Sequence, residues 1–269
     1  MTNIVITGCS TGIGLECALY LKKRMIKVYP TARKEEDVQK LKELGFEDAM
    51  LLDVTKPNTI KEVIDFVVDK DGKIDVWFNN AGYGQMGAIE DVSIIAIREQ
   101  FETNVFGLHE ATRQVLKVMR KQGYGKIIQH SSILGLVSLP YRGAYNASKY
   151  AIEGLTDTLR LELKDTKIYP ILLNTGPIES NFRKTAIKTL EKIDTQNSNF
   201  KEIYQKAQNG TMKKVPFSLP AEAVASVVHK VILNDKPHPR YYITKASYIL
   251  AFAKRVLPTS ILDKLLLKV

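Results

Sequence analysis

The sequence predicts an α/β protein with a doubly wound parallel sheet of about seven strands and helices on both faces. Short apolar, β-rich runs alternate with helical patterns along the chain. Short buried strands separated by helices of 10–25 residues are typical of a parallel sheet that crossover helices cover on both sides. No internal repeat or low-complexity linker interrupts the 269 residues, of which 45% are hydrophobic. We therefore expect residues 1–269 to form one domain with a large core.

The expected strands and helices follow in order. "NIVIT" (3–7) is a strand and 13–24 a helix; "KVYPT" (27–31) is a strand and 35–44 a helix; "AMLL" (49–52) precedes a helix over 59–68. "IDVWFN" (74–79) precedes one long helix over 95–121, and "GKIIQHS" (125–131) precedes a helix over 144–163. "KIYPILL" (167–173), a helix over 221–233 and "RYYIT" (240–244) complete the pattern.

Two segments depart from this alternation. Residues 178–216 are polar with scattered apolar positions at helical spacing, which indicates an excursion that covers a site. Residues 246–269 form a C-terminal helical tail in which Ile261, Leu262, Leu265, Leu266 and Val269 share one face. Such a helix docks on the core or a sister subunit, or lies on a membrane surface.

Charge and cysteine content narrow the functional classes. The formal net charge is +10, and the segment 211–269 holds ten Lys or Arg against three acids. This is a solvated basic face or a contact for anionic lipid headgroups. Zinc-ligand spacing and aromatic RNA-binding signatures are missing, so we expect no nucleic-acid partner. The chain has two cysteines and shows neither a signal-peptide pattern nor an apolar run of membrane length. These features favour a cytoplasmic protein, which can also bind a membrane surface peripherally.

A glycine-rich turn follows the first strand. "TGCSTGIG" (7–14) places glycines at 8, 12 and 14, where a backbone can approach a pyrophosphate closely and a helix N-terminus can bind it. Its position at the first strand–helix turn is what makes the match specific. The expected nucleotide contacts here are Gly8, Ser10, Thr11, Gly12, Ile13 and Gly14.

The second strand ends in basic residues. Arg33 and Lys34 follow Ala32, and acids appear only from Glu35 onward, inside the next helix. An acid at this position binds the ribose 2′-hydroxyl of NAD, whereas an arginine accommodates the 2′-phosphate of NADP. We therefore expect NADP(H) in preference to NAD(H); the alternative is that both residues are ordinary surface charges.

Two further strands end at the same sheet edge. Asp53 and Val54 follow the third strand, with Asp53 placed to accept an adenine amino group. Asn80, Ala81 and Gly82 follow the fourth strand, where small and amide residues suit a backbone packed against a nucleotide. Asn79 or Asn80 can equally be a turn residue.

Three residues carry the expected chemistry. Tyr145 and Lys149 are four apart on a helix, about 6 Å from each other, so the ammonium favours the phenolate of an acid with an ordinary pKa of about 10. Ser132 would hydrogen-bond the substrate oxygen and hold it at Tyr145. Tyr241 and Lys245 share the spacing, but "RYYIT" reads as a strand, where four residues span about 13 Å.

The order TGCSTGIG, DV, NNAG, a helical Asn, a Ser, YNASK and NTGPI resembles the short-chain dehydrogenase/reductase family over residues 3–180, in its shorter branch. This resemblance implies a Rossmann-type fold and adds Asn104 as a fourth catalytic residue, supporting a water that links the lysine to solvent. It also implies that Lys149 contacts the nicotinamide ribose and that Pro177 and Ile178 lie near the carboxamide. Members assemble as dimers or tetramers through the two long helices.

The substrate pocket is expected to include Tyr83, Met86, Leu134 and Leu139, besides Ser132 and Tyr145. The apolar "ILGLVSLP" favours a lipophilic alcohol or carbonyl compound, unless these residues only pack the core. Hydroxysteroid and retinol dehydrogenases, which share this arrangement, are the similar members of the family. The expected activity is an NADP(H)-dependent carbonyl reductase or alcohol dehydrogenase without a metal. The alternatives are a non-catalytic nucleotide-sensing protein and a sugar-nucleotide epimerase or dehydratase, whose larger C-terminal domain is missing.

Overall fold

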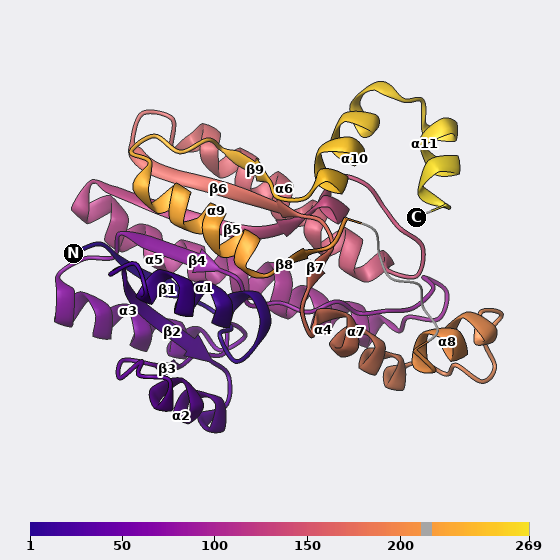
Figure 1. Cartoon of the computed structure of the whole chain (residues 1–269), viewed down its shortest axis with the longest axis horizontal. Coiled ribbons are helices and arrows are strands. Elements are labelled where there is room, and N and C mark those ends of the chain that lie inside the picture. The colour runs from indigo at the N-terminus through magenta and orange to yellow at the C-terminus, as the bar shows by residue number, and fades with distance from the viewer. Residues whose placement is uncertain (211–216, 269) are drawn as a thin grey trace.

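The computed structural model describes residues 1–210 and 217–268 and contains a central sheet of seven strands (Figure 1). In spatial order these are β3 (Met50–Leu51), β2 (Lys27–Ala32), β1 (Asn3–Ile6), β4 (Val76–Asn79), β5 (Tyr124–Ser132), β6 (Lys167–Thr175) and β9 (Arg240–Tyr242). Every neighbouring pair is parallel. The strand order reverses at β1, where β2 lies on one side and β4 on the other, so the doubly wound prediction is confirmed.

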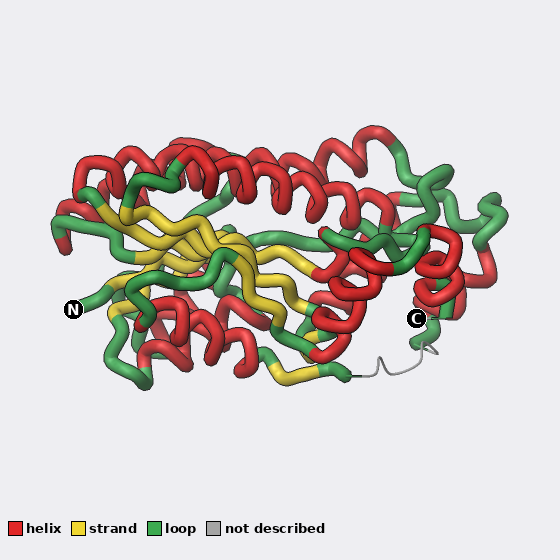
Figure 2. The backbone as a smooth tube through the Cα atoms, turned by 90° about the horizontal axis from the view of Figure 1, so that it is seen from above, coloured by secondary structure: helices red, strands yellow, loops and turns green. Residues whose placement is uncertain are grey.

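Helices cover both faces of this sheet (Figure 2). One face packs against α1 (Gly12–Lys22), α2 (Glu35–Glu43) and α9 (Glu222–Leu233), and the other against α3 (Pro57–Asp71), α5 (Leu108–Gln122) and α6 (Gly143–Glu162). Strand β1 shows why the sheet is buried on both sides. Ile4 and Ile6 enter the first core and Val5 enters the second, because successive side chains of a strand point to opposite faces.

The long helix expected over 95–121 is interrupted. It consists of α4 (Ile94–Phe101), a π-helical turn η1 (Glu102–Gly107) and α5. Gly107 explains part of this geometry, since a Cβ there would lie 2.6 Å from the carbonyl oxygen of Val54. The apolar periodicity of the sequence runs through this turn unbroken, so the interruption was not predicted. Such turns often occur at functional sites.

The excursion after β6 contains a second, two-stranded sheet and three short helices. Strand β7 (Ile178–Glu179) pairs with β8 (Leu219–Pro220), and α7 (Phe182–Lys188), η3 (Thr189–Lys192) and α8 (Lys201–Gln208) lie between them. Residues 211–216 of this predicted segment lie outside the described residues, as does Val269 of the tail. The small sheet was not predicted, because two-residue strands leave no periodic pattern in the sequence.

The C-terminal tail forms two helices, α10 (Lys245–Val256) and α11 (Thr259–Leu266), at one end of the molecule (Figure 1). Leu262 and Leu266 of α11 are buried in a cluster that also contains Leu250 and Tyr145. The tail therefore docks on the core of its own chain. Ile261 and Leu265, which the sequence placed on the same face, stay exposed.

Candidate active site

The turn between β1 and α1 needs glycine at three positions. Gly8 and Gly12 have positive φ angles of 73° and 63°, which favour glycine. A Cβ on Gly14 would lie 2.4 Å from the carbonyl oxygen of Gly8 and 2.5 Å from Nδ2 of Asn80. Helix α1 begins at Gly12 with no acid in its first turn, so its N-terminal N–H groups suit an anion. Thr11, directly before the helix, has an extended backbone. Ser10 precedes it in the loop, and Ile13 is the second residue of α1.

The end of β4 supports this turn from the neighbouring strand. The side chain of Asn80 donates to the carbonyl oxygens of Thr7 (2.9 Å) and Gly8 (3.1 Å). The backbone N–H groups of Asn80 and Ala81 donate to the Thr7 hydroxyl at 3.0 and 2.9 Å. Asn79 instead bonds within the core to Thr112, so of the two amides it is Asn80 that contacts the predicted nucleotide turn.

The basic residues after β2 are exposed. Lys34 forms a surface ion pair with Glu36 at 3.2 Å. Within residues 1–210 and 217–268, Arg33 forms no hydrogen bond or ion pair. Burial raises the pKa of Tyr83 to about 12, and the positive charge of Arg33 partly opposes this rise. The guanidinium of Arg33 is therefore available to an anionic group.

Asp53 stands at the next strand end, as expected. One oxygen of its carboxylate accepts from the backbone N–H (3.0 Å) and the hydroxyl (2.8 Å) of Thr55, a local turn that fixes the side chain. Its neighbour Val54 is buried. Sequence reasoning did not foresee this partner for Asp53, although Thr two residues after Asp is a common turn signal.

Ser132, Tyr145 and Lys149 lie together at the carboxyl ends of β5 and β6. All three are buried, with exposures of 7%, 8% and 7%. The Ser132 hydroxyl accepts from the backbone N–H of Leu134 at 3.1 Å and reaches the carbonyl oxygen of Thr175 at 3.4 Å. The Lys149 ammonium lies 5.6 Å from the centre of the Tyr145 ring and donates to the carbonyl oxygen of His130.

The electrostatics differ in one respect from the sequence expectation of a phenolate-favouring site. Burial raises the pKa of Tyr145 to about 12, and the hydrogen bond with Ser132 and the charge of Arg142 only partly oppose it. Burial also lowers the pKa of Lys149 to about 8, against the opposing charge of Glu153. In the protein alone the phenol is therefore protonated at neutral pH and the lysine is largely an ammonium.

Asn104 is buried in the π-helical turn. Its Oδ1 accepts from the backbone N–H of Tyr83 at 3.1 Å, and its Nδ2 donates to the Tyr83 carbonyl at 3.0 Å and the Ser148 hydroxyl at 3.1 Å. From sequence alone this was a polar residue in a helix and normally exposed. The side chain instead fastens the segment after β4, including Gly82, to helix α6.

The excursion closes over Tyr145. The ring of Phe182 at the start of α7 lies 5.3 Å from the Tyr145 ring, and Leu134 and Leu139 pack in the same cluster. A cavity of only about 10 Å³ remains beside Tyr145, lined in part by Met86 and Arg142. Phe182 and Arg142 were not predicted. The excursion as a whole was expected to cover the site, but no local pattern identifies which of its residues faces the tyrosine.

Residues 2–191 match the family model for short chain dehydrogenase, which is more than half of the chain. The chain belongs to this family. An oxidoreductase of Escherichia coli K12, YbbO, of uncharacterized function, is 36% identical over 98% of this chain and 93% of its own length. The 3-ketodihydrosphingosine reductase of Bacteroides thetaiotaomicron is 30% identical, covering 87% and 84%. Bovine retinol dehydrogenase 8 is also 30% identical, covering 87% and 79%.

Solved structures of short-chain dehydrogenases have the same fold. ElxO with NADP bound is 26% identical, covers 90% of this chain and 96% of its own, and has a TM-score of 0.73. A Burkholderia phymatum enzyme in complex with NAD is 25% identical, covers 95% and 92%, and has a TM-score of 0.77. Similar proteins thus bind either nicotinamide cofactor. Among the residues described here, no cluster of His, Cys, Asp or Glu suits a metal ion.

Proposed function

We propose that this oxidoreductase transfers a hydride between NADP(H) and a carbonyl or alcohol carbon of a lipophilic substrate, with Tyr145 as general acid and base. The observation that carries the proposal is the convergence of Tyr145, Lys149 and Ser132 at the strand ends beside the glycine turn. A non-catalytic nucleotide sensor has no need for a buried ammonium next to a buried phenol, because each costs free energy to desolvate.

Each side chain has one task in this proposal. The bound cofactor supplies or takes the hydride. Tyr145 donates a proton to the carbonyl oxygen in reduction, which its raised pKa allows because the phenol is protonated beforehand. The Lys149 ammonium stabilises the phenolate that remains, and Ser132 holds the substrate oxygen. Asn104 positions the segment around Tyr83 through its hydrogen bonds to the Tyr83 backbone and the Ser148 hydroxyl.

The proposed cofactor contacts extend along the strand ends. The pyrophosphate lies at the glycine turn, the 2′-phosphate at Arg33 and Lys34, the adenine at Asp53 and Val54, and the nicotinamide end near Asn80, Ala81, Gly82, Lys149, Pro177 and Ile178. The position of Ser180 supports this arrangement. A Cβ added to Gly12 would lie 3.6 Å from the Cβ of Ser180, which is ordinary van der Waals contact. The segment after β7 thus lies directly over the turn.

The apolar residues around the tyrosine favour a lipophilic substrate, and Phe182 has to move aside to admit one because the cavity beside Tyr145 is only about 10 Å³. Leu134, Leu139 and Phe182 share a cluster with Tyr145, and Met86 lines the small cavity beside it. Tyr83, one residue before Gly84, remains a proposed pocket residue, and its backbone is held by Asn104. Two of the relatives are named for long apolar substrates, 3-ketodihydrosphingosine and retinol. A long-chain aldehyde, ketone or secondary alcohol is therefore our choice of substrate class.

The assay that tests this function follows NADPH absorbance with a panel of aldehydes, ketones and quinones of increasing chain length. We expect turnover that rises with the apolar length of the substrate. Cofactor binding without oxidation of NADPH or reduction of NADP with any member of the panel would favour the nucleotide-sensing alternative.

Arg33→Ala tests the cofactor preference. We expect it to weaken NADPH binding roughly tenfold to a hundredfold, because a guanidinium–phosphate contact is charge-assisted, and to leave NADH binding unchanged. Fluorescence titration of both cofactors measures the two affinities. Lys40→Ala, which removes an exposed ion pair of α2 with Asp37, is the matched control. Equal losses for NADPH and NADH would contradict the proposed phosphate contact.

We also propose a homodimer or homotetramer that buries the outer faces of the helices around the site. Ile95, Phe106, Leu155 and Leu161 of α4, η1 and α6 are each more than 40% exposed. Exposed apolar side chains gathered on neighbouring helices are typical of subunit interfaces.

Contact with an anionic membrane surface is proposed for α10. Its outer stripe combines Tyr248, Ile249, Phe252 and Val256, all more than half exposed, with the exposed Lys245 and Arg255 on the same side. Apolar and aromatic side chains with flanking cations suit an interface of anionic headgroups. No described helix is long and apolar enough to span a membrane. Both cysteines are free and buried, and we propose a cytoplasmic location on that ground.

Phe252→Asp tests this contact better than removal of α11, whose Leu262 and Leu266 belong to the core. We expect co-sedimentation with vesicles of anionic phosphatidylglycerol to fall several-fold, and to fall further in high salt. Leu233→Asp, at the exposed end of α9, is the control. Identical sedimentation of both variants would rule out α10 as the membrane contact.

A further inference from the structure

Helix α6 carries a third buried ionisable side chain in line with Tyr145 and Lys149. Glu153 follows Lys149 by one helical turn, so the three side chains share one face of the helix. The side chain of Glu153 is only 8% exposed. A carboxylate is rarely buried this deeply unless it is paired, so its surroundings require an explanation.

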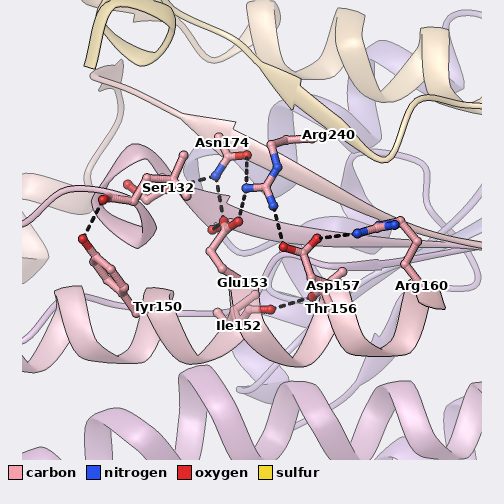
Figure 3. Close-up of polar contacts among 11 residues, drawn as sticks. Ser132, Tyr150, Ile152, Glu153, Thr156, Asp157, Arg160, Asn174 and Arg240 are labelled. Atoms are coloured by element: carbon pink, nitrogen blue, oxygen red, sulfur yellow. Dashed lines mark hydrogen bonds and ion pairs between the residues drawn. The ribbon is translucent and has the colours of Figure 1, made fainter. Parts of the chain in front are cut away.

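The partners of Glu153 come from three strands of the sheet (Figure 3). Its Oε1 accepts from the Ser131 hydroxyl of β5 and from Nδ2 of Asn174 of β6, the latter at 2.7 Å. Its Oε2 accepts from the Arg240 guanidinium of β9. An oxygen that accepts from two donors while the other faces a guanidinium belongs to an ionised carboxylate.

This arrangement reaches the proposed catalytic serine. Ser131 directly precedes Ser132, and the amide of Asn174 that bonds Glu153 also donates to the Ser132 carbonyl at 3.2 Å. Gly135, in the turn after Ser132, packs so closely that a Cβ would lie 2.9 Å from Cγ of Glu153. The carboxylate therefore joins the strand that carries Ser132 to the helix that carries Tyr145 and Lys149.

The charges around Glu153 form a balanced set. On its own helix are Lys149 on one side and Asp157 on the other; from β9 comes Arg240, which also pairs with Asp157 at 3.0 Å. His130 of β5 is neutral, because burial and the charge of Lys149 lower its pKa to about 3. Arg142 lies at the other end of the row, near Tyr145. Glu153, one helical turn after Lys149, is thus the carboxylate whose charge acts on the Lys149 ammonium.

We propose that Glu153 is a positioning residue of this active site, whose buried carboxylate fixes Ser132 relative to Tyr145 and holds a negative charge one helical turn from Lys149. The inference rests on the proposed function for the roles of those three residues. Glu153 raises the pKa of Lys149 against the effect of burial, and therefore keeps the lysine charged at neutral pH. It does not touch substrate, cofactor or reacting atoms.

Glu153→Gln tests the proposal, since it keeps the shape of the side chain and removes the charge. We expect kcat to fall roughly tenfold to a hundredfold, the loss typical of a misplaced catalytic group. The affinity for NADPH at the glycine turn should stay the same. Without the carboxylate Lys149 loses its proton at lower pH. The alkaline limb of the pH profile of carbonyl reduction, which needs the ammonium, therefore moves to lower pH.

Asp157→Asn is the matched control, because Asp157 also pairs with Arg240 but is 44% exposed and one turn farther from Lys149. We expect it to leave kcat and the pH profile close to wild type. If Glu153→Gln is too unstable to purify, Glu153→Asp and Ser131→Ala take its place. Both keep a charge near Lys149 but loosen the bond to β5, so we expect a lower kcat with the pH profile unmoved.

NMR titration of Lys149, assigned as the lysine signal that is missing in Lys149→Met, gives a readout that needs no substrate. A Lys149 midpoint that moves to lower pH in Glu153→Gln supports the inference even if no substrate of the panel turns over, in which case only the proposed function fails. A folded Glu153→Gln protein with wild-type kcat and midpoint overturns the inference. So does an equal loss in Asp157→Asn, which would point to Arg240 and not to the charge beside Lys149.

Discussion

Tyr145→Phe should lower kcat by roughly 10²–10⁴-fold, the usual contribution of a general acid, while the protein stays folded and binds NADPH as before. The substitution removes one oxygen from a ring that is held by packing against Phe182 and Leu134. Within residues 1–210 and 217–268, that oxygen forms no hydrogen bond with the backbone. Steady-state kinetics with the best substrate of the panel, together with NADPH titration, separates the loss of proton transfer from any loss of binding.

Tyr241→Phe is the control for this experiment. Tyr241 and Lys245 have the same spacing as Tyr145 and Lys149, but Tyr241 lies in strand β9 and its hydroxyl accepts from the backbone N–H of His238 at 3.0 Å. We expect wild-type turnover from this variant. If Tyr145→Phe retained turnover within a few-fold of wild type, another group would have to supply the proton, and the assignment of Tyr145 would be wrong.

The fold could be predicted from sequence because its signals are local. Buried strands such as 3–7 have an uninterrupted apolar centre, and each is separated from the next by a helix long enough for a crossover. The glycine turn was found for the same reason: Gly8, Gly12 and Gly14 follow directly after a strand, and the structure shows that a side chain at Gly14 would collide with Gly8 and Asn80.

Contacts between distant segments left no such signal. Glu153 reads as an ordinary helical glutamate, since its partners Asn174 and Arg240 are 21 and 87 positions away. Phe182 belongs to a polar excursion without strong periodicity, and only the folded chain brings its ring to Tyr145. The electrostatic prediction failed in part for a related reason. Spacing placed a cation beside the phenol, but burial, which a single sequence does not reveal, has the larger effect on its pKa.

Lys149→Met should abolish most activity and, at the same time, stabilise the fold. The ammonium that supports the phenolate is lost, so we expect kcat to fall by roughly 10²–10⁴-fold. Burial lowers the pKa of Lys149 from 10.5 to about 8, which means that its charged form destabilises the native state by roughly 3 kcal/mol at neutral pH. The variant also loses the hydrogen bond to the His130 carbonyl, which costs about 1 kcal/mol. We therefore expect its free energy of unfolding to rise by roughly 2 kcal/mol.

The sign of the pH dependence follows from the order of the two pKa values. The unfolded chain, with a lysine pKa near 10.5, binds more protons than the native protein between about pH 8 and 10.5, so wild-type stability rises with pH across this window. The advantage of Lys149→Met is therefore full below about pH 8 and shrinks toward pH 10.5. Thermal unfolding of both proteins at about pH 7 and about pH 10 measures it, with the exposed Lys245→Met as control. A Lys149→Met protein that is less stable than wild type at neutral pH would show that the ammonium is better paired than its burial implies, and that the site stores no strain for its chemistry.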